Sequence, residues 1–123
     1  MMEDFSWLGR TSLLIGEEKL KVLSNKHVMI VGMGGVGSFA AEFICRSGIG
    51  KMTIIDGDIV DPTNRNRQLP ALSTNHGELK AEIMKKRLLA INPELNLQCV
   101  AAFINPDMVE QLFDHHYDYI IDA

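Results

Sequence analysis

The sequence predicts an α/β protein with a Rossmann-like, doubly wound parallel sheet in a three-layer α/β/α arrangement. Three observations predict this fold class. Short β-branched segments alternate with amphipathic ones, a glycine-rich motif (Gly32-Met33-Gly34-Gly35-Val36-Gly37) follows the first β-branched segment, and no internal repeat interrupts the alternation. Parallel strands require crossover connections, and the helices in these connections cover the faces of the sheet. The 123 residues have the length of one domain.

The composition argues against several other classes of protein. Hydrophobic residues make up 46% of the chain and charged residues 23%, which is ordinary for a globular domain. Cys45 and Cys99 are too few for a zinc cage and fit a reduced, cytoplasmic protein. No segment approaches the ~20 apolar residues that cross a membrane. The net charge of −4 does not indicate a nucleic-acid binder.

Residues 1–26 are predicted to form an N-terminal helical arm. Apolar residues between Thr11 and Leu23 follow a helical period, which Gly16 interrupts. The remainder, residues 27–123, is predicted to form the Rossmann-like domain.

The first β-α-β unit of that domain is predicted from three segments. His27–Val31 is a β-branched run that ends at a glycine, as a buried parallel strand does. Gly35–Ser47 indicates a helix with Gly48 as its C-cap, and Lys51–Asp56 indicates the second strand. The helix face toward the sheet is predicted to hold Val36, Ala40, Phe43 and Ile44.

A long polar segment, Gly57–Glu78, follows the second strand. Loops of this length in a compact domain are usually functional. Proline and asparagine signals then separate the last elements. These are a helix over Leu79–Ile91, a strand over Leu95–Ala102, a short helix from Asn105-Pro106 and a fourth strand over Tyr117–Ile121.

The glycine motif and Asp56 indicate an adenine-nucleotide site. Glycines between a strand and a helix let the turn fold tightly and let backbone N–H groups approach a phosphate at the positive end of the helix. Asp56 ends the second predicted strand, where a carboxylate can accept both ribose hydroxyls. These features do not distinguish ATP from NAD, and a turn needed only for helix–strand packing is the structural alternative.

Basic residues in the long loop favour ATP. The loop contains Asn64-Arg65-Asn66-Arg67-Gln68, and Lys80 follows at the start of the next helix. Two guanidiniums and an ammonium carry more positive charge than a diphosphate needs, and they suit a triphosphate or an acyl-adenylate. A solvated basic loop is the alternative. The alternative of an NAD-binding module of dehydrogenase type gives Arg67 and Lys80 no role in binding the nucleotide.

Several spaced motifs resemble the adenylate-forming superfamily of ubiquitin-activating-type enzymes, the HesA/MoeB/ThiF family. The motifs begin at Gly32, Asn64 and Lys80 and read GMGGVGSFAAEFICRSGIGKMTIIDGD, NRNRQ and KAEIMKKRLLAINPE. The resemblance covers about Trp7 to Ala123. Within the superfamily, RTSLLIG near the start, KAEIM and the YDYIIDA ending are most similar to the tRNA threonylcarbamoyladenosine dehydratases.

This resemblance implies roles for individual residues. The glycine turn would hold the ATP phosphates through Gly32, Gly34, Gly35 and Gly37, and Asp56 would hold the ribose. Further nucleotide contacts would come from Asn64, Arg67, Gln68 and Lys80. Arg10 matches the position from which relatives supply an arginine across a homodimer interface. The implied catalytic residues are therefore Arg10, Arg67 and Lys80.

The cofactors that the resemblance implies are ATP and magnesium. It implies no magnesium ligand among the residues of this chain. The family's magnesium-binding aspartate lies a few residues past the position of Asp122. Because the chain ends at Ala123, directly after the fourth predicted strand, we expect it to be the N-terminal part of a longer protein. We also expect this part to bind nucleotide weakly and not to turn over.

The resemblance implies an ATP-dependent enzyme that activates a carboxylate. In the dehydratases this is the carboxylate of a threonylcarbamoyl group on a tRNA adenosine, and the activated side chain then cyclises. The alternative is an adenylyltransferase that activates a ubiquitin-like sulfur-carrier protein for thiamine or molybdopterin biosynthesis. A non-catalytic interaction domain is a further alternative, which the presence of Arg10, Arg67 and Lys80 disfavours.

Overall fold

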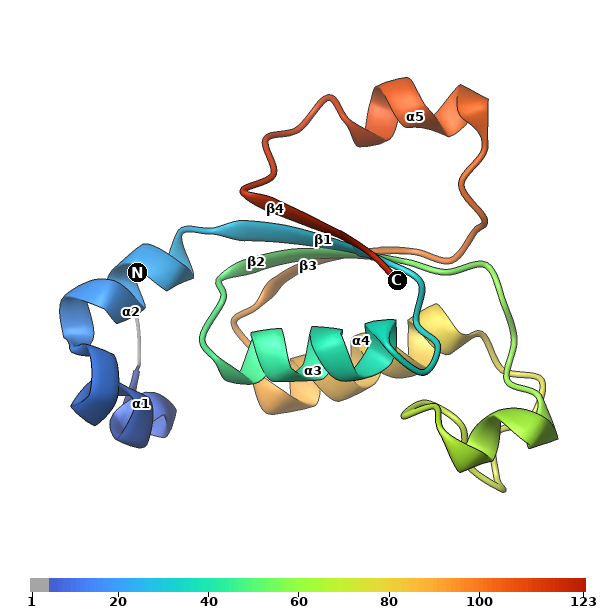
Figure 1. Ribbon diagram of the computed structural model, residues 1–123, viewed down its shortest axis with the longest axis horizontal. Helices are drawn as coiled ribbons and strands as arrows, with labels where there is room; N and C mark the ends of the chain where they lie inside the picture. Colours follow the sequence, from blue (N-terminus) through green and yellow to red (C-terminus); the bar gives the residue numbers. More distant parts are fainter. Residues whose placement is uncertain (1–4) are drawn as a thin grey trace.

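The computed structural model describes residues 5–123 and contains a four-stranded, all-parallel sheet (Figure 1). The spatial order of the strands is β3-β2-β1-β4, so the first strand lies in the interior of the sheet. This order confirms the predicted doubly wound arrangement. The strands are β1 (His27–Val31), β2 (Lys51–Ile55), β3 (Asn96–Val100) and β4 (Tyr119–Asp122).

Helices cover both faces of the sheet. Two of them, α3 (Gly37–Arg46) and α4 (Lys80–Ile91), lie against one face, and α5 (Pro106–Leu112) lies on the other (Figure 1). Successive residues of a strand point to opposite faces. Accordingly, Ile30 packs among side chains of α3 and α4, while Met29 packs with the buried leucine of α5. The three predicted layers are therefore confirmed.

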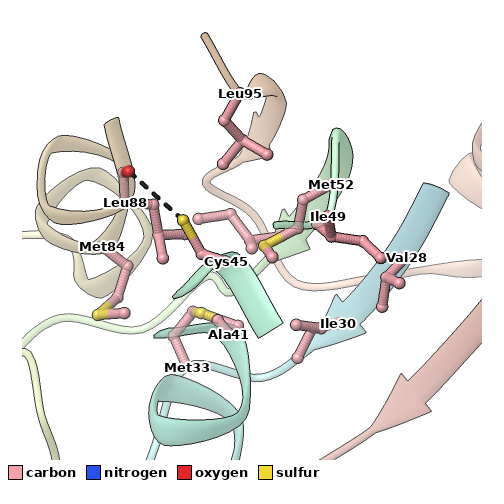
Figure 2. Close-up of a cluster of buried hydrophobic side chains, with 11 residues drawn as sticks. Val28, Ile30, Met33, Ala41, Cys45, Ile49, Met52, Met84, Leu88 and Leu95 are labelled. Carbon is pink, nitrogen blue, oxygen red and sulfur yellow. Dashed lines mark hydrogen bonds between the residues drawn. The ribbon is translucent and has the colours of Figure 1, made fainter. Parts of the chain in front are cut away.

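The larger core lies between the sheet and the helices α3 and α4 (Figure 2). Cys45 on α3 and Met84 and Leu88 on α4 are completely buried in it. The Cys45 thiol donates to the carbonyl oxygen of Leu88, 3.6 Å away, and burial raises the pKa of Cys45 to about 11. A thiol with that pKa stays protonated at neutral pH, so Cys45 packs as a small hydrophobic residue.

The buried face of α3 differs from the predicted one. Val36 and Phe43 are 72% and 64% exposed, whereas Ala41 and Cys45 are completely buried. Of the four residues predicted to face the sheet, only Ile44 packs against this core cluster. The prediction followed the bulkiest apolar side chains. It was wrong because the close-packed interior beneath α3 is filled by the smaller side chains of Ala41 and Cys45.

The arm contains η1 (Ser6–Leu8), α1 (Gly9–Ile15) and α2 (Glu17–Ser24). Gly16 separates the two α-helices with φ +85°, a backbone conformation that favours glycine, so the predicted break is confirmed. Residues 1–4 of the predicted arm lie outside the described residues. The division of the chain into units 1–26 and 27–123 stays a prediction.

The last two strands are shorter than predicted or shifted. β3 ends two residues before Ala102, and β4 begins at Tyr119 and reaches Asp122. None of the helices described between residues 5 and 123 is long and apolar enough to cross a membrane.

His27 occupies a buried polar position at the start of β1. It is 4% exposed, and its Nδ1 lies 3.0 Å from the carbonyl oxygen of His116. Because a carbonyl only accepts, Nδ1 carries the proton, and Nε2 accepts from the Thr53 hydroxyl at 2.7 Å. Burial lowers the pKa of His27, although the hydrogen bond to His116 acts in the opposite direction. The folded state therefore favours the neutral ring.

We expect the free energy of unfolding to fall as the pH is lowered from 7.5 to 5.5. The unfolded chain binds a proton at His27 near its ordinary pKa of ~6.5, before the folded chain does, so acidification favours unfolding. Urea unfolding at both pH values measures the difference. The variant His27→Gln should show a smaller pH dependence, and His76→Gln, which alters an exposed histidine, should retain that of the parent. Equal pH dependence in all three proteins would contradict this assignment.

Candidate nucleotide site

The glycine turn joins the carboxyl end of β1 to the amino end of α3. Gly32 has φ +97°, and its N–H donates to the carbonyl oxygen of Ile55 at 2.7 Å, which ties the turn to β2. A Cβ on Gly37 would overlap the carbonyl oxygen of Gly32. These two glycines are therefore required for the turn itself. The amino end of α3 is left facing the carboxyl edge of the sheet, where a helix dipole favours an anion.

Asp56 lies directly after β2 and holds the turn from the other side. One of its carboxylate oxygens accepts the backbone N–H of Met33 at 2.6 Å, and the other accepts that of Asp58 at 2.6 Å. A carboxylate offers about four acceptor positions, so two hydrogen bonds leave capacity for ribose hydroxyls. The predicted ribose residue is thus also a structural link between the glycine turn and the long loop.

The long loop contains a short 3₁₀ helix, η2 (Pro62–Asn66), that the sequence analysis missed. Asp61 caps it by accepting from the backbone N–H of Thr63 at 2.9 Å, and the Asn64 amide oxygen accepts from the Asp61 N–H at 2.8 Å. The signal was present in the sequence as Asp61-Pro62, since aspartate before proline is a common start of a helical turn. Asn64 is 8% exposed and stabilises the loop. Its contact with phosphate stays a prediction.

The loop places Arg67 and Gln68 against the glycine turn. A Cβ on Gly35 would lie 3.6 Å from Cγ of Arg67, and one on Gly34 would lie 3.5 Å from the Gln68 amide nitrogen. Arg67 is exposed, and its guanidinium donates to the Asn66 side chain at 2.8 Å. The buried Oε1 of Gln68 has no hydrogen-bond partner among the described residues. This oxygen can accept a hydrogen bond from a ligand.

Ser38 connects these parts and was not predicted. It is completely buried in the first turn of α3, and its hydroxyl donates to the carbonyl oxygen of Gly34. The Ser38 hydroxyl oxygen also accepts from the backbone N–H of Leu69 at 3.4 Å. Ser38 therefore links the glycine turn to the loop that contains Arg67.

Lys80 is the first residue of α4 and is 4% exposed. Its ammonium nitrogen lies 3.2 Å from Oδ2 of Asp58, and this hydrogen bond holds the pKa of the Asp58 carboxyl below its usual range. Asp58 in turn donates its backbone N–H to Asp56. The structure thus connects two predicted site residues, Asp56 and Lys80, through Asp58.

A pocket of about 120 Å³ lies beside Asp56 at the carboxyl ends of the strands. Gly57, Phe103 and Ile104 contribute to its mainly apolar wall. A Cβ on Gly57 would approach the Phe103 backbone nitrogen too closely, so glycine is required for this wall to form. An apolar pocket next to a carboxylate can receive a flat base while the carboxylate binds the attached sugar.

Arg10 is not brought to this site. It is exposed on α1, and the arm lies toward the amino end of β1, away from the glycine turn (Figure 1). Within residues 5–123 there is no group of three or more histidine, cysteine, aspartate or glutamate side chains that could hold a metal ion.

Comparison with known proteins identifies the family. Residues 8–123 match the ThiF family. The chain belongs to this family. It is 46% identical over 123 residues to the tRNA threonylcarbamoyladenosine dehydratase of Bacillus subtilis, covering 100% of this chain and 47% of that protein. It is 39% identical over 110 residues to a probable molybdopterin-synthase adenylyltransferase of Porphyra purpurea, covering 89% of this chain and 28% of that protein.

Solved structures show the same likeness. The Escherichia coli tRNA N6-threonylcarbamoyladenosine dehydratase in complex with ATP is 45% identical, with a TM-score of 0.93. The match covers 100% of this ThiF-family chain and 51% of that one. The chain thus spans about half the length of these dehydratases. The predicted family and fold are confirmed, while the contacts of individual residues with nucleotide stay predictions.

Proposed function

We propose that this ThiF-family chain binds ATP and forms part of an enzyme that activates a carboxylate by adenylation. The observation that carries this proposal is the packing of Arg67 and Gln68 against the glycine turn, with buried Lys80 joined to Asp56 through Asp58. A dinucleotide site does not need these cations, whereas a triphosphate benefits from them. The ATP complex of a dehydratase with 45% identity supports the same assignment.

The chain's residues have distinct tasks in this proposal. Asp56 orients the ribose, and the turn between Gly32 and Gly37 directs backbone N–H groups at the phosphates. Arg67 and Lys80 offset the negative charge that gathers on the phosphates when a carboxylate oxygen attacks the α-phosphorus and pyrophosphate leaves. ATP supplies the leaving group, because the acyl-adenylate formed can release AMP, which an unactivated carboxylate cannot.

Magnesium is proposed to accompany ATP. The described residues do not form a cation site by themselves, since no group of three or more potential ligands occurs among them.

We propose a threonylcarbamoyl group on tRNA as the carboxylate substrate, in a cytoplasmic enzyme. The 46% identity to the Bacillus subtilis dehydratase, over the whole of this chain and 47% of that protein, supports this substrate. The second candidate is a ubiquitin-like sulfur carrier, supported by the 39% identity to the Porphyra purpurea protein. A purified longer protein that consumes ATP with modified tRNA, but not with a sulfur carrier, would decide for the first.

We further propose a homodimer in which Arg10 acts on the partner's site. The separation of Arg10 from its own glycine turn supports this, as do Leu13 and Leu14, which are 82% and 85% exposed on the same helix. Exposed leucines of this kind are typical of an interface. Sedimentation of the chain as a monomer at high micromolar concentration would contradict the dimer.

Calorimetric titration with ATP–Mg²⁺ and separately with NAD⁺ tests the nucleotide assignment. We expect the chain to bind ATP weakly and NAD⁺ not at all, and Arg67→Ala to weaken ATP binding by about tenfold or more, as loss of a charged hydrogen bond does. Arg65→Ala is the matched control, because Arg65 is exposed in the same loop. NAD⁺ binding that is indifferent to Arg67 would refute the proposed function.

A further inference from the structure

We propose that Asp58 is a positioning residue of the phosphate site, whose carboxylate holds the Lys80 ammonium in place and competes for it with phosphate groups. This inference rests on the proposed function, in which Lys80 binds ATP phosphates. Asp58 is not among the residues that the sequence predicts to bind nucleotide.

The ion pair joins a buried cation to an accessible anion. The side chain of Lys80 is 5% exposed, whereas that of Asp58 is 56% exposed, and the two charged atoms are 3.2 Å apart. Among the described residues, Asp58 is the hydrogen-bond and ion-pair partner of the Lys80 ammonium. A buried ammonium needs a negative partner. Since the anion stands on the solvent side, a phosphate arriving from solvent can take its place.

The backbone of Asp58 is held on both sides by hydrogen bonds that do not involve its Lys80 ion pair. Its N–H donates to Asp56 at 2.6 Å, and its carbonyl oxygen accepts the N–H of Lys80 at 3.1 Å. The remaining carboxylate oxygen, Oδ1, accepts from the N–H of Ile59 at 2.9 Å. Loss of the ion pair to a phosphate therefore breaks a side-chain contact and leaves the backbone hydrogen bonds of Asp58 to Asp56 and to the start of α4 in place.

Electrostatics sets the expected sign of the effect. The hydrogen bond from Lys80 keeps the Asp58 carboxyl ionised at neutral pH, so it repels an approaching phosphate. Asparagine has nearly the same shape and keeps an oxygen that accepts from the ammonium. Because its amide is neutral, it competes less strongly with phosphate for the Lys80 ammonium. The nucleotide then encounters a Lys80 ammonium without a counter-charge. We expect Asp58→Asn to bind ATP about tenfold more tightly than the parent chain.

The test compares ATP, inorganic tripolyphosphate and adenosine as ligands of the parent chain and of Asp58→Asn. We expect tighter binding of ATP and tripolyphosphate and unchanged binding of adenosine, because adenosine has no phosphate. Glu78→Gln is the matched control. It makes the same change in net charge at an exposed position two residues before Lys80, and it should alter ATP affinity less than about twofold.

The possible results separate this inference from the proposed function. Equal or weaker ATP binding by Asp58→Asn, in a parent chain that binds ATP, would refute the role of Asp58 and leave the proposed function intact. Absence of ATP binding by the parent chain would refute both. A merely structural role for Asp58 would weaken adenosine and ATP alike.

A second variant keeps the test decisive if Asp58→Asn unfolds. Asp58→Glu retains the competing charge on a longer side chain, so it should bind ATP no more tightly than the parent. Thermal unfolding with and without each ligand shows whether the variant is folded. ATP binding tightened about tenfold by Asp58→Glu would overturn the proposal.

Discussion

Replacement of Gly37 by alanine is expected to lower the free energy of unfolding by at least about 3 kcal/mol and to abolish ATP binding. The added Cβ would overlap the carbonyl oxygen of Gly32, and it would also lie 3.2 Å from the Cβ of Ala123. A carbonyl oxygen cannot move aside without displacing the turn that joins β1 to α3. Urea unfolding followed by circular dichroism measures the loss.

Gly35→Ala provides the matched control within the same turn. Its Cβ would meet Cγ of Arg67 at 3.6 Å, an ordinary van der Waals contact, and Gly35 does not have a positive φ. We expect its stability to stay within about 1 kcal/mol of the parent, as for a tolerated surface change. If both variants were equally stable, the close approach at Gly37 would not be what requires glycine.

The second large effect is expected for Asp56→Asn. Both oxygens of Asp56 accept backbone N–H groups at 2.6 Å, from Met33 and from Asp58. Asparagine has one oxygen and one NH₂ group, so one of the two backbone donors would face another donor. We expect the free energy of unfolding to fall by about 2 kcal/mol. ATP affinity should fall by roughly tenfold or more, because the ribose contact and the turn are both impaired.

Asp122→Asn is the control for that substitution. Asp122 is exposed at the carboxyl end of β4, near the same edge of the sheet, and the structure gives its side chain no hydrogen bond within residues 5–123. Its stability should match the parent within about 0.5 kcal/mol. A loss at Asp122 equal to that at Asp56 would attribute the effect to charge at the sheet edge and not to the two hydrogen bonds.

Much of the fold could be predicted because local patterns determine it. β1 coincides with the predicted strand, and β2 ends one residue before Asp56, since β-branched runs bounded by glycine have few other folded forms. The break at Gly16 followed from the missing Cβ alone. The face of α3 could not be predicted in this way. Which residues are buried depends on how closely the helix approaches the sheet.

In the candidate site, too, some residues could be predicted from the sequence and others could not. The glycine motif and Asp56 were found from the sequence because their spacing follows from one strand-turn-helix unit and the next strand. The roles of Ser38 and Asp58 were missed, as was the Gln68 amide oxygen that has no hydrogen-bond partner within residues 5–123. Their roles depend on contacts between the turn, the long loop and α4, whose relative positions no local pattern encodes.

Local sequence patterns were therefore enough to predict the fold class, the family resemblance and the residue types available to a nucleotide. These follow from periodicity, glycine placement and motif spacing, which are properties of neighbouring residues. The burial of Lys80 against Asp58 and the hydrogen bonds of Asp56 to two loops became visible in the folded chain alone. Burial and long-range hydrogen bonding arise when segments distant in the chain pack together. The electrostatic state of the site is for that reason a property of the folded protein.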